Sequence, residues 1–221
     1  MYDHVIWPER YDPKTSAIYA LNDIDVKAPA EVVWKLLVDA ENWSSYFPAE
    51  DQVKILTGKP ELALQTRYSR VTVAFPMSLV VTECEPFRRL AWATTVDGDE
   101  TGSSAYHGWV ITPTVDGCHV LTEETQQGPW FLEELGRKHP GALYRYHQEW
   151  VESLARAARR KWQAGQVEWA CLEAWPVAWA ATLSTEQYWA CLRPEYCRYS
   201  TDDGRFQPGS ADDHPPTIGD K

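Results

Sequence analysis

The strongest constraint on the fold is a long amphipathic helix predicted over residues 142–163. One face is apolar except for a single histidine: Leu143, His147, Trp150, Val151, Leu154 and Ala158. The opposite face is charged: Arg145, Glu149, Glu152, Arg156 and Arg159. A helix with one apolar face has to bury that face against another layer of structure. The chain that precedes it therefore has to supply a sheet or a second helical layer.

Short strands are predicted through most of the preceding chain. An alternating run over 16–27 predicts a first strand, and 30–40 and 41–48 predict two short helices after it. Runs rich in Val, Thr and aromatic residues then alternate with turn sequences: 52–56, 62–74, 77–85, 89–96, 103–112 and 118–127. With no long helical pattern between them, these runs favour an antiparallel meander.

This order of elements predicts an α+β helix-grip fold. A seven-stranded, curved antiparallel sheet wraps around the long C-terminal helix, with two short helices after the first strand. A helix lying across a strongly bent sheet leaves room for a ligand between the two. We therefore expect an internal cavity for an apolar small molecule.

Four segments are predicted along the chain. Residues 1–15 form an N-terminal extension, 16–163 the helix-grip domain, 164–200 an aromatic-rich helical appendage, and 201–221 a disordered tail rich in Asp, Gly and Pro. The appendage is expected to contain short helices over 168–175 and 185–192. It serves as a lid over the pocket, as part of a homodimer interface, or as cover for exposed sheet.

Charge and hydropathy exclude several classes of protein. The net charge of −11 argues against nucleic-acid binding. The one basic run, 156–161, suits a solvated helix end, with attraction of an acyl carrier protein as the alternative. No apolar stretch is long enough to cross a membrane, and the N-terminus does not read as a signal peptide. These features predict a soluble, cytoplasmic protein.

Motifs for metals and cofactors are missing from the sequence. Five cysteines without C-x-x-C spacing indicate neither a disulfide framework nor a zinc knuckle. The six histidines are scattered, without H-x-x-x-H or H-E-x-x-H spacing, so no metal site is predicted. No G-x-G-x-x-G or P-loop sequence occurs, and no cofactor is expected.

Four stretches carry a family resemblance. They read DVKAPAEVVWKLLVD at 25–39, followed by ENW at 41–43, then EPFRRLAW at 85–92, HGWVITP at 107–113 and VLTEET at 120–125. In this order and spacing they resemble the START-like (Bet v 1-like) superfamily, in particular its polyketide cyclase/dehydrase family. The resemblance covers residues 16–163.

The resemblance implies a pocket but leaves the chemistry open. The superfamily includes aromatase/cyclases, lipid carriers and hormone receptors, and a fold does not determine a reaction. The first interpretation is a biosynthetic enzyme for natural products, which cyclises or dehydrates a polyketide-like carbonyl compound without a cofactor. The alternatives are a non-catalytic carrier of a lipid or hydrophobic metabolite, and an interaction module that uses the aromatic appendage.

Strand alternation selects the candidate site. If Val120 points inward, so do Thr122, Glu124 and Gln126. The candidate catalytic residues are His107, His147, Glu124 and Arg70. The candidate substrate-binding residues are Tyr68, Trp92, Tyr106, Trp109, Thr122 and Trp150, of which Tyr106 reaches the pocket only from the opposite face or through a bulge.

The candidate roles follow from acid–base chemistry, and each has a structural alternative. A histidine and a carboxylate in a dry pocket can divide the acid and base roles, while Arg70 stabilises an enolate oxygen. Alternatively, His147 is a hydrogen-bonded core residue and Glu124 forms an internal ion pair with Arg70. A register shift of one residue would turn Glu123 inward in place of Glu124.

Overall fold

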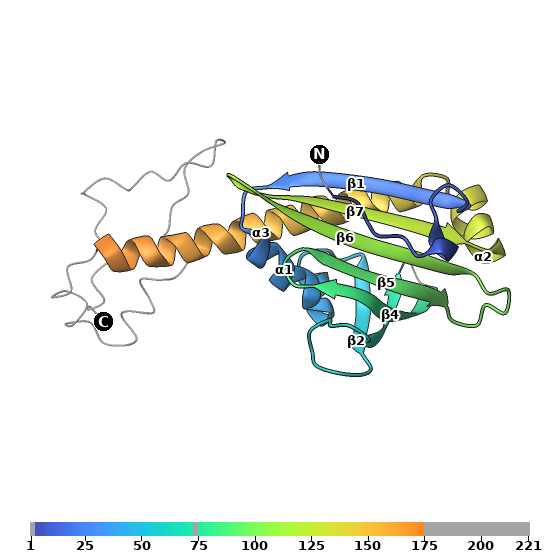
Figure 1. Ribbon diagram of the computed structural model, residues 1–221. Helices are drawn as coiled ribbons and strands as arrows, with labels where there is room; N and C mark the ends of the chain where they lie inside the picture. Colours follow the sequence, from blue (N-terminus) through green and yellow to red (C-terminus); the bar gives the residue numbers. More distant parts are fainter. Residues whose placement is uncertain (1–2, 73–74, 175–221) are drawn as a thin grey trace, which may run out of the picture. The chain divides into compact units, whose positions relative to one another are not determined.

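The computed structural model describes residues 3–72 and 75–174 (Figure 1). Residues up to Ala164 form one compact unit, which contains the whole sheet. Within the described residues, no helix is both long and apolar enough to cross a membrane.

A single antiparallel sheet forms most of this unit. Its seven strands lie in the order β1-β7-β6-β5-β4-β3-β2. Their bounds are β1 Ile18–Val26, β2 Glu50–Ile55, β3 Arg67–Thr72, β4 Phe75–Glu85, β5 Arg89–Val96, β6 Ser104–Thr114 and β7 Gly117–Gln127. The sheet curves along one side of α3 (Figure 1). The predicted seven-stranded helix-grip fold is confirmed.

The helices also follow the predicted order. Their bounds are η1 Glu9–Tyr11, α1 Ala30–Val38, η2 Ala40–Ser45, α2 Pro129–Phe131, η3 Leu132–Lys138 and α3 Ala142–Ala174. Helix α3 continues past its predicted end at residue 163, and it includes most of the short helix expected over 168–175. The remainder of the predicted appendage and the tail at 201–221 lie outside the described residues.

One predicted strand is shorter than expected. The run 62–74 predicted a long third strand, but β3 begins only at Arg67. The residues before it form a loop, in which the Leu62 amide donates to the Val38 carbonyl and the Thr66 amide to the Ala63 carbonyl. These hydrogen bonds satisfy part of the loop's backbone, and only its last residues bond to β4, where the Gln65 amide donates to the Val81 carbonyl and the Thr66 carbonyl accepts from the Val81 amide.

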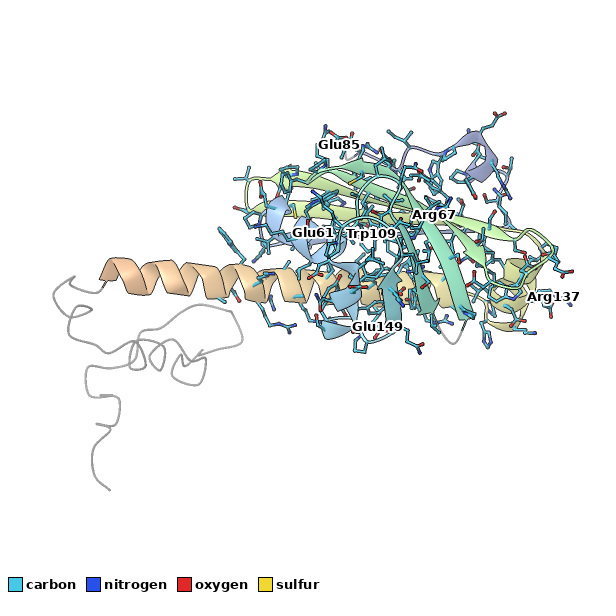
Figure 2. The ribbon with its side chains drawn as sticks, turned by 90° about the horizontal axis from the view of Figure 1, so that it is seen from below. Glu61, Arg67, Glu85, Trp109, Arg137 and Glu149 are labelled. Carbon is cyan, nitrogen blue, oxygen red and sulfur yellow. The ribbon has the colours of Figure 1, made fainter. Side chains whose placement is uncertain are left out.

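The inner face of the sheet packs against α3 through aromatic rings. Trp150 of α3 is fully buried, with ring centroids 5.0 Å from Trp43, 5.2 Å from Phe47 and 5.1 Å from Trp109. In Figure 2, Trp109 lies on the sheet side of α3 and the exposed Glu149 on the other side. Such rings combine a large buried area with specific edge-to-face contacts, so they fix how α3 lies on the sheet.

The outer face of β6 and β7 is covered by the N-terminal segment. Val5 and Tyr11 of that segment are buried against the sheet, where Tyr11 stacks on Tyr106 at 5.3 Å. Gly108 makes this packing possible, because a Cβ atom there would lie 2.5 Å from a Val5 methyl carbon. The predicted extension is therefore part of the folded structure over its described residues.

Candidate functional site

Strand register brings two of the predicted site residues side by side on the inner face. His107 of β6 pairs with Glu124 of β7, and Trp92 of β5 pairs with His107. His147 reaches the same point from α3, where its ring stacks on that of His107 with centroids 4.5 Å apart. We call His107, Glu124 and His147 the inner triad.

The inner triad is closely spaced and buried. Glu124 Oε2 lies 3.0 Å from His107 Nδ1 and 3.3 Å from His147 Nε2. The side chains of His107, Glu124 and His147 are 0%, 6% and 1% exposed. A charge at this depth interacts strongly with its neighbours, because little water screens it.

The charge states follow from burial and from these contacts. Burial and the adjacent His147 lower the pKa of His107 to about 3, so its ring is neutral near neutral pH. Burial alone would raise the pKa of Glu124, but the two imidazoles beside it hold that pKa well below its usual range. The site therefore contains an ionised carboxylate beside a neutral His107 ring.

Thr122 determines which nitrogen of His107 carries the proton. The Thr122 hydroxyl donates to the Gly108 carbonyl at 3.1 Å, which uses its only hydrogen. It lies 2.6 Å from His107 Nε2 and accepts a hydrogen bond from that nitrogen. The proton of neutral His107 is then on Nε2, and Nδ1, on the side of Glu124, keeps a lone pair.

The remaining contacts of the inner triad are one amide and a set of indole rings. Gln126 Nε2 donates to Glu124 Oε1 at 2.6 Å and so orients the carboxylate. Rings of Trp92, Trp109 and Trp150 lie 4.8, 5.4 and 5.6 Å from the His107 ring. The triad is thus a polar cluster within an aromatic environment.

A second buried polar cluster contains Arg70. Its Nη1 lies 2.5 Å from Glu50 Oε1, and the Tyr146 hydroxyl donates to the same oxygen. Burial raises the pKa of Glu50, with Arg70 opposing that rise. Burial alone would lower the pKa of Arg70, but Glu50 raises it. We call Glu50, Arg70 and Tyr146 the Glu50 cluster.

Most predicted site residues are together in the structure. His107, His147, Glu124 and Thr122 are in direct contact, and the interior also contains the predicted rings of Tyr68, Trp92, Trp109 and Trp150. Glu124 points inward and Glu123 outward, so the shifted register does not occur.

Two predictions have to be corrected. Tyr106 lies on the outer face, where it stacks on Tyr11 and is within 3.3 Å of the Thr82 hydroxyl, because neighbouring residues of a strand point to opposite faces. It is not part of the inner site. The suggested ion pair between Glu124 and Arg70 also does not form, because Arg70 is bound by Glu50.

Glu50 and Tyr146 were not predicted from the sequence. A buried arginine requires a carboxylate partner, which was a usable signal. Glu50, however, precedes the predicted start of its strand at residue 52, so no inward direction could be assigned to it. Tyr146 is partly buried next to His147, at the margin of the apolar helix face.

The inner triad also has the composition of a metal site. Its two imidazoles and one carboxylate place one potential ligand atom each within 4.8 Å of the others. The sequence predicted no metal because the three residues lie far apart along the chain. The antiparallel pairing of β6 with β7 and the packing of α3 bring them together.

Comparison with known proteins identifies the family. The family model described as "Polyketide cyclase / dehydrase and lipid transport" matches residues 22–159. No curated protein sequence matches the chain.

Solved structures share the fold at low sequence identity. The Helicobacter pylori protein jhp0584 has a TM-score of 0.66 and 23% identity, covering 72% of this chain and 98% of that one. The di-domain ARO/CYC StfQ of the steffimycin biosynthetic pathway has a TM-score of 0.55 and 13% identity, over 69% of this chain and 54% of that one. A conserved Geobacillus kaustophilus protein gives 0.51 and 15%, over 65% and 96%. Because the family model matches most of the chain, the protein belongs to the polyketide cyclase/dehydrase and lipid transport family.

Proposed function

We propose that the protein is a biosynthetic enzyme that cyclises or dehydrates an apolar, polyketide-like carbonyl compound by acid–base chemistry, without a cofactor. The observation that carries this proposal is the inner triad, with Glu124 Oε2 at 3.0 Å from His107 and 3.3 Å from His147. A protein that only stores an apolar molecule has no need for such a cluster, since burying polar groups costs free energy. Membership of the family supports a polyketide-related substrate.

His107 is the base in this proposal. Its Nδ1 lone pair removes a proton from a carbon beside a carbonyl group, and the resulting imidazolium is stabilised by the Glu124 carboxylate. The enolate carbon attacks a second carbonyl carbon of the same chain, which forms a C–C bond and an alkoxide. The alkoxide takes the proton back from His107, and loss of water from the aldol product then gives the dehydrated ring.

Unpaired donors on the inner side support a ligand with several carbonyl oxygens. The Tyr68 hydroxyl, Arg70 Nε, Trp92 Nε1 and Trp109 Nε1 are all buried and have no hydrogen-bond partner among the described residues. Each such donor costs about 1–3 kcal/mol if it stays unsatisfied. A polyketone chain supplies acceptors at regular spacing, so its oxygens would pair with these donors and hold it in a folded conformation. Arg70 Nε is the donor proposed to stabilise the enolate.

The aromatic rings have to move for such a ligand to bind. Trp43, Trp92 and Trp150 pack with ring centroids 5.0–6.4 Å apart in the interior. A multi-ring ligand would replace these contacts with stacking on its own rings. Closing the rings around the bound chain would exclude water from the reacting carbonyl groups.

The second candidate function is transport of a lipid or hydrophobic metabolite. The apolar rings that line the interior favour it, and the family description includes lipid transport. The two candidates differ in the inner triad, which catalysis requires and transport does not.

Location and partners are also part of the proposed function. We place the enzyme in the cytoplasm, and the exposed Arg156, Arg159, Arg160 and Lys161 of α3 are the basic surface for an acidic acyl carrier protein. A homodimer is the proposed oligomeric state. Native mass spectrometry of the purified protein, alone and with a carrier protein, measures both.

The test of function is native mass spectrometry of the protein purified from its own host. Wild type should retain a cyclised or dehydrated small molecule, whereas His107→Ala and His147→Ala should retain its linear or hydrated precursor. The control is His139→Ala, which removes an exposed histidine outside the inner triad and should behave as wild type. The same unaltered compound in all four proteins would reject catalysis and leave the carrier function.

A further inference from the structure

The two imidazole–carboxylate contacts of the inner triad are short but do not have the geometry of hydrogen bonds. Glu124 Oε2 is 3.0 Å from His107 Nδ1 and 3.3 Å from His147 Nε2, yet neither nitrogen has a hydrogen-bond partner among the described residues. In a hydrogen bond the acceptor lies close to the N–H axis. Here the oxygen lies off that axis in both contacts.

Such bent contacts are typical of ligands around a common cation. Zinc ligands of N and O type lie about 2.0–2.2 Å from the ion, which puts two of them about 3.3 Å apart in a tetrahedral site. Their lone pairs point at the ion between them rather than at each other. We propose that the inner triad binds a divalent transition-metal ion, Zn²⁺ being the best match, through His107 Nδ1, His147 Nε2 and Glu124 Oε2.

The tautomer of His107 supports this site independently. Thr122 accepts the Nε2 proton, so a bare Nδ1 lone pair lies 3.0 Å from a carboxylate oxygen in a dry interior. Two electron-rich atoms at this separation repel each other unless a positive charge lies between them. A dication removes that repulsion.

Two of the three ligands, His107 and Glu124, have surroundings of the kind that orient metal ligands, while Nδ1 of His147 has no hydrogen-bond partner among the described residues. Metal-bound histidines usually donate their other ring N–H to a fixed acceptor, as His107 does to Thr122. Gln126 holds the second oxygen of Glu124. A site of two imidazoles and one carboxylate suits zinc, iron or cobalt better than magnesium or calcium. Among the described residues, no fourth His, Cys, Asp or Glu joins the group, which leaves a coordination position for water or a substrate oxygen.

Comparison with a second histidine–carboxylate cluster, around His119, shows what is specific here. His119 Nδ1 lies 2.8 Å from Asp25 and forms a hydrogen bond with it, while Nε2 lies 3.4 Å from Asp23. Both aspartates are largely exposed to water, at 81% and 52%. In that cluster the ring nitrogen has a hydrogen bond and the carboxylates face water, whereas the inner triad is buried and its nitrogens next to Glu124 have no hydrogen-bond partner among the described residues.

The geometry of the inner triad supports the metal site whether or not the proposed function is correct. The site uses the same atoms as the proposed function, however. A cation on His107 Nδ1 occupies the lone pair that the acid–base proposal assigns to proton removal. The metal-loaded form should therefore be inactive in the proposed cofactor-independent closure. Metal binding and that activity are expected to compete.

The test begins with metal-free full-length protein, prepared by dialysis against a chelator. Titration with Co²⁺ should give visible absorption bands that saturate at one equivalent, and Zn²⁺ should displace the cobalt. Glu124→Gln and His147→Gln should each weaken binding at least tenfold. Thr122→Val, which keeps all three ligands, should weaken it about 10–100-fold. His119→Gln is the matched control and should bind as wild type.

Nuclear magnetic resonance of ¹⁵N-histidine in the wild type tests the site without any substitution. Added Zn²⁺ should shift Nδ1 of His107 and Nε2 of His147 and leave both nitrogens of His119 unchanged. Unshifted triad nitrogens at saturating zinc would overturn the inference, as would cobalt binding that His147→Gln and Glu124→Gln leave unaltered. Zinc binding together with no turnover by the metal-free protein would uphold this inference and count against the proposed function, while turnover by the metal-free protein without zinc binding would do the reverse.

Discussion

Glu123 and Glu124 are adjacent in β7, both are buried, and they lie in opposite environments. On the outer face, Glu123 accepts hydrogen bonds from the Val5 amide at 2.9 Å and from the Tyr19 hydroxyl at 2.6 Å. On the inner face, Glu124 has one good hydrogen bond, from Gln126, and two bent contacts with imidazoles. Both oxygens of Glu123 accept hydrogen bonds that hold the fold together, whereas only one oxygen of Glu124 does so.

The difference separates structural polar groups from candidate functional ones. A buried polar group that serves stability has its hydrogen bonds satisfied. Glu123 meets this condition and ties the N-terminal segment and β1 to β7. His107 and His147 do not, because His107 Nδ1 and both ring nitrogens of His147 have no hydrogen-bond partner among the described residues. Unsatisfied groups in an interior indicate a ligand, an ion or a reaction.

The largest expected effect concerns the buried ion pair of the Glu50 cluster, in which Arg70 Nη1 is bound by Glu50 Oε1. Arg70→Met leaves Glu50 buried without its cation and should lower the free energy of unfolding by about 3–5 kcal/mol. Urea denaturation measures it. The double variant Arg70→Met/Glu50→Met removes both charges and should recover most of the loss. If the double variant loses as much unfolding free energy as Arg70→Met alone, the unpaired buried charge of Glu50 is not the cause of the loss.

The next effect concerns the outer face. Gly108→Ala puts a methyl group 2.5 Å from a Val5 methyl carbon, and such overpacking should cost about 1–3 kcal/mol. Thermal unfolding of Gly108→Ala, Val5→Ala and the double variant measures the coupling. Because Val5→Ala makes room, the double variant should be more stable than the sum of the two losses predicts. Simple additivity would mean that the two residues do not meet in solution.

The smallest effect concerns Thr122. Thr122→Val removes the acceptor of the His107 Nε2 proton and should cost about 1 kcal/mol of stability. Its specific effect is on the tautomer, since the proton is then free to move to Nδ1, on the side of Glu124. The ¹⁵N shifts of His107 report this change, and Thr122→Ser should keep the wild-type tautomer. Equal Nδ1 and Nε2 shifts in wild type and Thr122→Val would show that Thr122 does not fix the tautomer.

Hydrophobic alternation in the sequence was sufficient to predict the fold and the residues of the inner triad, but not the partners of Arg70. The period-two pattern from Val120 to Gln126 identified Glu124 as inward, and the helical period placed His147 on the same side. Alternation also put Tyr106 on the opposite face, so its place in the site depended on a bulge, and the register of β6 is unbroken at that residue. The packing of the N-terminal segment on this outer face, where Val5 meets Gly108, is encoded by no local pattern. The Arg70–Glu50 pair and the convergence of His107 with His147 depend on how β2 and α3 pack, which is a tertiary property.

The most direct test of the central claim is the free energy of unfolding of Glu123→Met and Glu124→Met, measured by urea denaturation in metal-free buffer. We expect Glu123→Met to lose about 3 kcal/mol, because it leaves the Val5 amide and the Tyr19 hydroxyl without their acceptor. Glu124→Met should change stability by less than about 1 kcal/mol or increase it, since the inner triad is not arranged for stability. Equal losses in the two variants would contradict this distinction, because Glu124 would then be a structural residue like its neighbour.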